Sequence, residues 1–351
     1  MYYVAIRGYM FDTFLIVLNP MLSLVFCMAL GFLLRKKNIL PEDAGTVMSK
    51  LINWVFFPAL GFSALARYCK IDTIAAHSQN LILSLLIICL ALLVATLLSK
   101  VFIKTPSAER GIYAYALMFG NFGSVGDPLV IGVFGEMFYS YYKLFTLPLT
   151  ILVYTWGMSM LVPTNKDKTS SDAADAKKTK VISSLKKLFN PTTIAMLLGI
   201  IVGLTDTAQY FPDFIHTSLD SLKNCVGPVA MIVAGFTVAS YDLKEMLANK
   251  KYYFATALRL FIIPTLLIGT MFFLKEGMNL LFNLSIGNSV LYLALFAYAA
   301  PLGLNTVVFP LAYGGNPKIG AGMALISHVL CAISIPIMFT LMTLVFGAPV
   351  I

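Results

Sequence analysis

Long apolar runs separated by short polar clusters dominate the pattern of the chain. Each run is about 20 residues long, which is the length that an α-helix needs to cross the hydrocarbon core of a bilayer. Short strands with a period-two alternation do not occur, so a transmembrane β-barrel is not expected. The pattern predicts an all-α integral membrane protein with ten spans, at 12–34, 43–66, 79–102, 110–135, 139–162, 190–206, 217–240, 251–274, 287–313 and 317–347.

One long polar segment interrupts this pattern. Residues 164–187, "TNKDKTSSDAADAKKTKVISSLKK", are rich in lysine and small residues, which is typical of a flexible linker. The segment divides the chain into a first five-span unit at 1–163 and a second at 188–351. Since each unit has an odd number of spans, the second enters the membrane inverted relative to the first.

Composition and charge agree with a membrane protein. The chain is 59% hydrophobic and only 12% charged, whereas soluble domains carry about 25% charged residues. Of the 25 lysines and arginines, 19 fall on one side of the predicted membrane. The positive-inside rule then places the 164–187 loop in the cytoplasm and both termini outside. The net charge of +9 is therefore explained by orientation in a lipid membrane, and nucleic acid is not an expected partner.

The two halves resemble each other faintly. "NWVFFPALGFSALA" (53–66) and "NCVGPVAMIVAGFTVA" (224–239) both have an asparagine shortly before a proline. The fourth span contains "FGNFGSVGDPLV" (119–130), and the ninth contains "AYAAPLGLNTVVFPLAYGGNP" (297–317). Corresponding segments that glycine, proline and asparagine interrupt are the main sequence indication of a transport site built on inverted repeats. We therefore expect two inverted five-helix repeats.

Glycine and proline destabilise a continuous helix at these two places. Proline removes a backbone donor, and freed backbone groups inside a bilayer must face protein or a water-filled cavity. Two broken helices that cross can satisfy each other, and their half-helix ends then favour a carboxylate or a small ion. We expect the fourth and ninth helices to be broken near Gly123–Pro128 and Pro301–Asn305, and to cross within the membrane.

The candidate substrate-binding residues lie in these two interruptions: Asn121, Asn305, Gly120, Gly123, Pro128, Pro301, Gly303 and Thr306. An amide offers both donors and acceptors, so each asparagine can bind substrate or an ion, or instead close an opened backbone turn. The glycines can open the helix at a site, or only permit close helix packing. The prolines would hold the breaks.

Asp127 is the sharpest candidate, because a carboxylate inside a span is costly and indicates function. Three roles are open for it. It can couple transport to a proton or another cation, cap the half-helix that begins at Pro128, or contact substrate directly. Coupling and capping do not exclude each other.

Four further polar residues in the spans carry weaker signals. His328 is either a hydrogen-bonded packing residue or a proton relay. Asn53 and Asn224 either line the cavity or bridge helices. Arg259 is expected near the cytoplasmic end of the eighth span, with its side chain extended to the membrane surface.

Enzyme and metal chemistry have no sequence support. The motifs of zinc proteases, serine hydrolases, phosphate-binding loops and dinucleotide folds do not occur. The five cysteines are scattered without a CxxC spacing, so neither a metal site nor a disulfide framework is expected. No cofactor is expected beyond a coupling proton or sodium ion.

With these motifs in place, the sequence resembles the auxin efflux carrier family of membrane transport proteins. "NWVFFPALGFSALA", "GNFGSVGDPL" and "PLGLNTVVFPLAYGGNP" carry the resemblance, which extends over nearly the whole chain. It implies an elevator-type carrier with the crossed-helix architecture of sodium–proton antiporters and bile-acid symporters. Spans 1, 2, 6 and 7 would form a scaffold and homodimer interface, and spans 3–5 and 8–10 a mobile transport domain.

The resemblance also implies the substrate class, a small organic anion such as an auxin-like or dicarboxylate compound. Asp127 departs from the family, which usually has an apolar residue at its position. The short loop at 164–187 favours a microbial protein, in the plasma membrane of a bacterium. A sodium-coupled organic anion symporter of related fold is the alternative, and a membrane receptor or channel is the alternative from another class.

Overall fold

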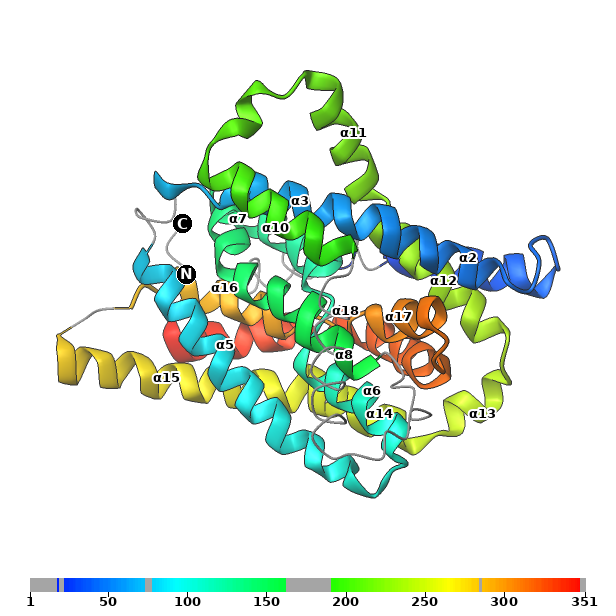
Figure 1. Cartoon of the computed structure of the whole chain (residues 1–351). Helices are drawn as coiled ribbons and strands as arrows, with labels where there is room; N and C mark the ends of the chain where they lie inside the picture. The colour runs from blue at the N-terminus through cyan, green and yellow to red at the C-terminus, as the bar shows by residue number, and fades with distance from the viewer. Residues whose placement is uncertain (1–17, 19–21, 73–77, 162–190, 284–285, 348–351) are drawn as a thin grey trace, which may run out of the picture.

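The computed structural model describes residue 18 and residues 22–72, 78–161, 191–283 and 286–347. Apart from one isolated β-bridge, the described residues form helices (Figure 1). After a helix at 22–36, the helices of the first half are α2 (Ala44–Leu51), α3 (Phe57–Tyr68), α5 (Ser78–Ser99), α6 (Ser107–Met118), α7 (Asp127–Leu152) and α8 (Met158–Leu161). Those of the second half are α10 (Pro191–Leu204), α11 (Asp213–Asn224), α12 (Val226–Ala239), α13 (Leu243–Ala248), α14 (Lys250–Ala257), α15 (Ile263–Phe282), α16 (Asn288–Tyr298), α17 (Asn305–Tyr313) and α18 (Lys318–Phe346).

Six continuous helical stretches in the described residues are long and apolar enough to cross a membrane. They are Ala44–Tyr68, Ile82–Lys104, Tyr141–Leu161, Asp213–Ala239, Lys250–Leu281 and Lys318–Phe346. Each coincides with one of the ten predicted spans. Of the other four, 110–135 and 287–313 are broken helices, 190–206 contains the short α10, and 12–34 lies partly outside the described residues. The all-helical membrane class is thus supported, whereas the number ten and the inverted repeat remain predictions.

Widened π-helical turns join several of these helices. Three of them, η1 (Ile52–Phe56), η3 (Phe122–Gly126) and η6 (Leu258–Ile262), run directly into α3, α7 and α15. Each following helix has proline as its second residue: Pro58, Pro128 and Pro264. Proline cannot donate to the carbonyl four residues earlier and its ring crowds that carbonyl. A wider turn relieves this conflict, so the chain stays helical through the proline.

The first helix, α3, α10 and α12 pack with their backbones close together. A methyl group added at Gly31 would lie 2.0 Å from the carbonyl oxygen of Ile232 in α12. One added at Gly199 in α10 would lie 2.7 Å from the carbonyl oxygen of Phe62 in α3, and Figure 1 shows these two helices side by side. These four helices come from the predicted scaffold spans, whose separation from a transport domain remains a prediction.

The two interrupted spans meet at their breaks. Helix α6 ends at Met118 and α16 at Tyr298, and the chain is not helical again until Phe122 and Asn305. Gly120 and Leu302 form an antiparallel bridge. The Asn121 backbone N–H donates to Pro301 O at 2.7 Å, and that of Gly303 donates to Phe119 O at 3.3 Å. Each break therefore satisfies backbone groups that the other leaves open.

The break in the fourth span begins earlier than predicted. It covers Phe119–Asn121, whereas Gly123 lies in η3 and Asp127 opens α7. Pro128 tolerates this place because the widened turn η3 leads directly into α7 and relieves the conflict between the proline and the preceding carbonyls. The predicted break at Pro301–Asn305 is confirmed in its position, since α17 resumes at Asn305.

Helix α7 folds back on itself at one glycine. Gly135 has φ +80° and ψ 179° inside an otherwise helical run, a conformation that is essentially restricted to glycine. The kink separates the first arm, which carries Asp127, from the second arm, which carries Lys143. It also marks the boundary between the predicted spans 110–135 and 139–162.

Gly135→Ala is expected to destabilise the protein by about 1–3 kcal/mol, because an alanine side chain strains this backbone conformation. The measurement is the unfolding midpoint of the detergent-purified protein. Gly269→Ala is the matched control, since it lies inside α15 where an added methyl group meets nothing within 4 Å. A helical Gly→Ala change of this kind should be neutral or stabilise by up to about 1 kcal/mol. Equal midpoints for the two variants would contradict the role given to the kink.

Candidate functional site

A cavity of about 410 Å³ lies where the two helix breaks face α3, α7, α11 and α12. One wall comes from the breaks and from both arms of α7, and the opposite wall from α3 and the α11–α12 junction. Its polar and charged lining residues include Arg67, Asn121, Asp127, Tyr139, Lys143, Lys223, Asn224 and Asn305. The cavity thus brings together residues from both halves of the chain.

Two half-helices begin at this cavity. Asn121 immediately precedes η3, which continues into α7, and Asn305 is the first residue of α17. The N-terminus of a helix carries a partial positive charge and has backbone N–H groups without intrahelical acceptors. The breaks therefore present two such ends beside one cavity, an arrangement that suits a carboxylate or another small anion.

His328 holds the side chain of Asn121. The Nδ1 atom of His328 lies 2.9 Å from Ala324 O, and its Nε2 atom lies 3.1 Å from Asn121 Nδ2. A neutral imidazole carries one N–H. Since Nδ1 faces a carbonyl acceptor, it is the donor, and Nε2 accepts from the asparagine. His328 is buried behind the cavity wall, so its packing role is supported and a proton relay through it remains a hypothesis.

Tyr115 holds the other asparagine in a similar way. Asn305 Nδ2 donates to Tyr115 Oη at 2.7 Å, and Tyr115, on α6, is completely buried. Each amide is thus anchored through its nitrogen by a ring on another helix. Such anchoring fixes the side-chain rotamer before any ligand arrives, which lowers the entropic cost of binding.

The remaining predicted residues divide between the cavity wall and the protein interior. Gly120, Gly123, Gly303 and Asn224 line the cavity. Pro301 is buried in the second break. Thr306 is buried in the first turn of α17, and its hydroxyl donates to Gly303 O in the break at 2.9 Å. Asn53 is also buried, and its Nδ2 donates to Ser49 O at 2.7 Å across the turn η1. The side chain of Pro128 lies outside the described part of the structure.

The prediction for Arg259 is wrong. Its side chain is completely buried and does not extend to the membrane surface. Nη1 donates to Leu117 O at 2.9 Å and Nε donates to Ala300 O at 3.2 Å. These carbonyls lie at the C-terminal ends of α6 and α16, where the helix dipole favours a cation. No sequence pattern predicts this contact, because both carbonyls belong to the backbone of distant helices.

Gly120 makes room for this arginine. A methyl group added there would lie 2.1 Å from Arg259 Nη2 and 3.1 Å from Ala300 O. The glycine is therefore needed where the guanidinium passes between the two breaks. Its role is close approach at the crossing, in addition to lining the cavity.

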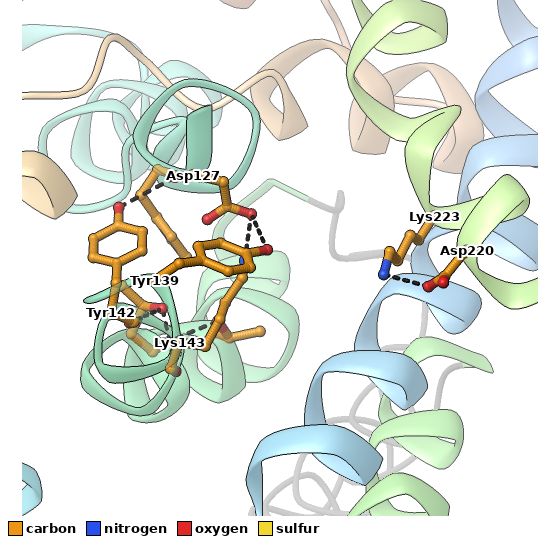
Figure 2. Close-up of polar contacts among 9 residues, drawn as sticks. Asp127, Tyr139, Tyr142, Lys143, Asp220 and Lys223 are labelled. Carbon is orange, nitrogen blue, oxygen red and sulfur yellow. Dashed lines mark hydrogen bonds and ion pairs between the residues drawn. The ribbon is translucent and has the colours of Figure 1, made fainter. Parts of the chain in front are cut away.

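Asp127 forms an ion pair that sequence reasoning missed. Its Oδ2 atom contacts Lys143 Nζ and accepts a hydrogen bond from Tyr139 Oη at 3.3 Å. Figure 2 shows both partners on the second arm of α7, which the kink folds back towards Asp127. The side chains of Lys143 and Asp127 are only 12% and 17% exposed. The available signal was Lys143, a lone lysine within the apolar run at 139–162. The charge count used it only to predict which side of the membrane lies outside.

The contacts of Asp127 bear on one of the three roles considered for it, the capping of α7. The first turn of α7 has no side-chain hydrogen bond that caps it, so capping is not the use that the structure gives this carboxylate. Its second oxygen, Oδ1, is buried without a hydrogen-bond partner. Within the described residues, no group of three His, Cys, Asp or Glu side chains is placed to hold a metal ion.

Arg259→Met is expected to cost about 2–5 kcal/mol of stability, because it leaves two buried carbonyls without donors. Arg259→Lys, which keeps the charge and one donor direction, should fall between this variant and the wild type. Unfolding midpoints in detergent check the order. Arg110→Met is the control: this exposed arginine also donates to a carbonyl, Thr105 O at 2.9 Å, and its loss should cost under about 1 kcal/mol. A fully stable Arg259→Met protein would contradict the structural role given to the hydrogen bonds from Arg259 to Leu117 O and Ala300 O.

Comparison with known proteins identifies the family of the chain. The model of a family described as "Membrane transport protein" matches residues 16–339. An uncharacterized transporter of Methanocaldococcus jannaschii is 21% identical over 230 residues, which cover 66% of this chain and 71% of the relative. Both matches are with transport proteins and not with enzymes. The chain is therefore a member of the auxin efflux carrier-like family of membrane transport proteins.

Proposed function

We propose that the protein is a secondary active transporter of the elevator type that carries a small organic anion. The observation that supports this most directly is that two half-helix N-termini and two anchored amides face the same cavity. Partial positive charge and free amide hydrogen-bonding capacity are what a carboxylate needs for recognition without a full countercharge. Substrate would bind between Asn121 and Asn305.

The position of the cavity supports an elevator movement. It lies between the predicted scaffold, represented by α3 and α12, and the crossing with α7. A site at such a boundary becomes exposed to one side or the other when one unit slides past the other. In this proposal the scaffold also forms a homodimer interface, the 164–187 loop is cytoplasmic, and the membrane is the plasma membrane of a bacterium.

Asp127 is proposed to couple transport to protons. It lines the cavity, and its Oδ1 atom is buried without a partner and could carry a proton. A sodium-coupled symporter of related fold is the alternative. A channel or receptor is the alternative from another class, and flux that saturates with substrate would separate a carrier from a channel.

A thermal-shift screen tests the substrate class. The purified protein is heated with a panel of small carboxylates, in sodium salts and in choline salts at equal ionic strength. Binding to the native state raises the apparent stability, so an organic anion that binds should raise the unfolding midpoint. Stabilisation that requires sodium would favour the symporter alternative. No response to any carboxylate, with a response to amines or sugars, would contradict the proposal.

Asn305→Ala is expected to weaken binding of the best carboxylate by at least about tenfold, or 1.4 kcal/mol, while the protein stays folded. The reason is the loss of one of the two anchored amides at the half-helix ends. Asn121→Ala should have a similar effect. Asn279→Ala, an exposed asparagine on α15 outside the cavity, is the control. Unchanged affinity in both cavity variants would remove the asparagines from the site.

Asp127→Asn is expected to abolish uptake driven by a pH gradient in proteoliposomes, while exchange of substrate across the membrane continues. Asparagine keeps the shape of the side chain but cannot carry the proton. Uptake and exchange are measured in the same vesicle preparation, with Asp127→Ala as a test of stability. Full gradient-driven uptake by Asp127→Asn would exclude this residue as the proton carrier.

A further inference from the structure

The ion pair in the cavity raises a question about the anion site. Lys143 is a full positive charge in the wall of a cavity proposed to bind an anion, yet Asp127 already occupies it. Two charged side chains in one wall sum to zero. As long as they stay paired, the lysine contributes little to anion affinity.

The contacts of the pair show what holds it closed. Tyr139 donates to the same carboxylate oxygen as Lys143, and its ring lies 5.1 Å from the ammonium nitrogen. Tyr142 donates to Phe122 O at 3.2 Å in the turn before Asp127. These residues and the pair all belong to η3 or α7. Asp127 Oδ1 is buried without a hydrogen-bond partner.

Among the described residues that line the cavity, the other charged side chains are Arg67 on α3 and Lys223 on α11. Tyr68, also on α3, packs its ring against that of Tyr139 at 6.2 Å. Lys223 is on α11, where it pairs with the half-exposed Asp220 (Figure 2). Arg67 and Lys223 line the cavity from the predicted scaffold, so an elevator movement would leave them behind. Lys143 shares its helix with the half-helix end at Asn121 and would move with the cargo.

We propose that Lys143 binds the carboxylate of the cargo, and that protonation of Asp127 releases Lys143 for this role. The inference rests on the proposed function, because it assumes an organic anion in this cavity. A hydronium ion transfers a proton to Asp127: one O–H bond of the hydronium ion breaks, one O–H bond forms on the carboxylate, and the contact of Asp127 with Lys143 is lost. The lysine remains an ammonium group throughout and pairs with the arriving anion. No other bond forms or breaks.

Charge balance in a low-dielectric cavity explains why the two events belong together. The empty site holds one ammonium and one carboxylate. The loaded site holds one ammonium, one neutral carboxylic acid and one bound anion, so its net charge is the same. An anion that entered without the proton would add a second carboxylate next to Asp127, and their repulsion is strong where water is excluded. One proton therefore accompanies each singly charged cargo anion.

Anion affinity at two pH values tests this exchange. The full-length protein in detergent is titrated with choline benzoate and choline phenylacetate, both monocarboxylates, at about pH 5.5 and pH 8, which are above the ordinary carboxyl pKa of about 4.3. The wild type should bind its better probe more tightly at the lower pH, because protonation of Asp127 frees the lysine. Asp127→Asn should bind at pH 8 at least as well as the wild type does at pH 5.5, with the pH dependence flattened.

Lys143→Gln should weaken binding by about tenfold or more at both pH values, and the double variant with Asp127→Asn should behave like Lys143→Gln alone. Lys143→Arg, which keeps a cation, should retain binding. Glu245→Gln is the matched control. It removes the acid of another ion pair and frees Lys318, and neither residue lines the cavity, so affinity and pH dependence should stay unchanged.

The two partners of one ion pair thus give opposite results, which a purely structural pair would not produce. Weaker binding by Asp127→Asn, unchanged binding by Lys143→Gln, or equal losses in Lys143→Gln and Lys143→Arg would each overturn the inference. The proposed function fails separately: it would be contradicted if neither probe shifted the unfolding midpoint of the wild type or of Asp127→Asn. Midpoints measured without probe show that each variant is folded.

Discussion

The structure depends on one constraint: two helices are interrupted inside the protein, and their opened backbone groups must find partners there. The breaks pair with each other through Gly120 and Leu302 and through two backbone hydrogen bonds. Arg259 completes the arrangement, because its guanidinium donates to a carbonyl at the end of α6 and to another just after α16. The N-terminal ends of the following half-helices are then left for the cavity. The helix dipole favours a cation at the C-terminal ends, where Arg259 lies, and it favours an anion at the N-terminal ends, which face the cavity.

Much of the fold could be predicted because membrane insertion imposes a simple pattern. Apolar runs long enough to span a bilayer identified six continuous helices, five of them to within a few residues, whereas Lys250–Leu281 extends beyond the predicted end at 274. The composition of 119–130 and 297–317 identified both broken helices, since glycine and proline oppose helices for local reasons. The site residues Asn121 and Asn305 followed from the same segments, and both line the cavity.

The parts that could not be predicted depend on contacts between distant residues. Arg259 was expected to extend to the membrane surface, because the backbone carbonyls that it contacts carry no sequence signature. The pairing of Lys143 with Asp127 could not be predicted, because it requires the reversal of the chain at Gly135. The break at Phe119–Asn121 lies where a bridging partner exists, and not where the densest cluster of helix-breaking residues stands. Propensity locates an interruption within one turn or so, whereas tertiary pairing fixes the residue.

The kink at Gly135 also separates early from late events in the biogenesis of the protein. Asp127 and Lys143 are 16 residues apart, so this pair needs only a short hairpin that is complete while the first half of the chain emerges from the ribosome. The hydrogen bond from Arg259 to Leu117 O joins residues 142 positions apart, and the β-bridge joins Gly120 to Leu302. Neither can close until the second half has been synthesised and inserted. The backbone groups of the first break therefore gain their final partners only after the second half of the chain is in place.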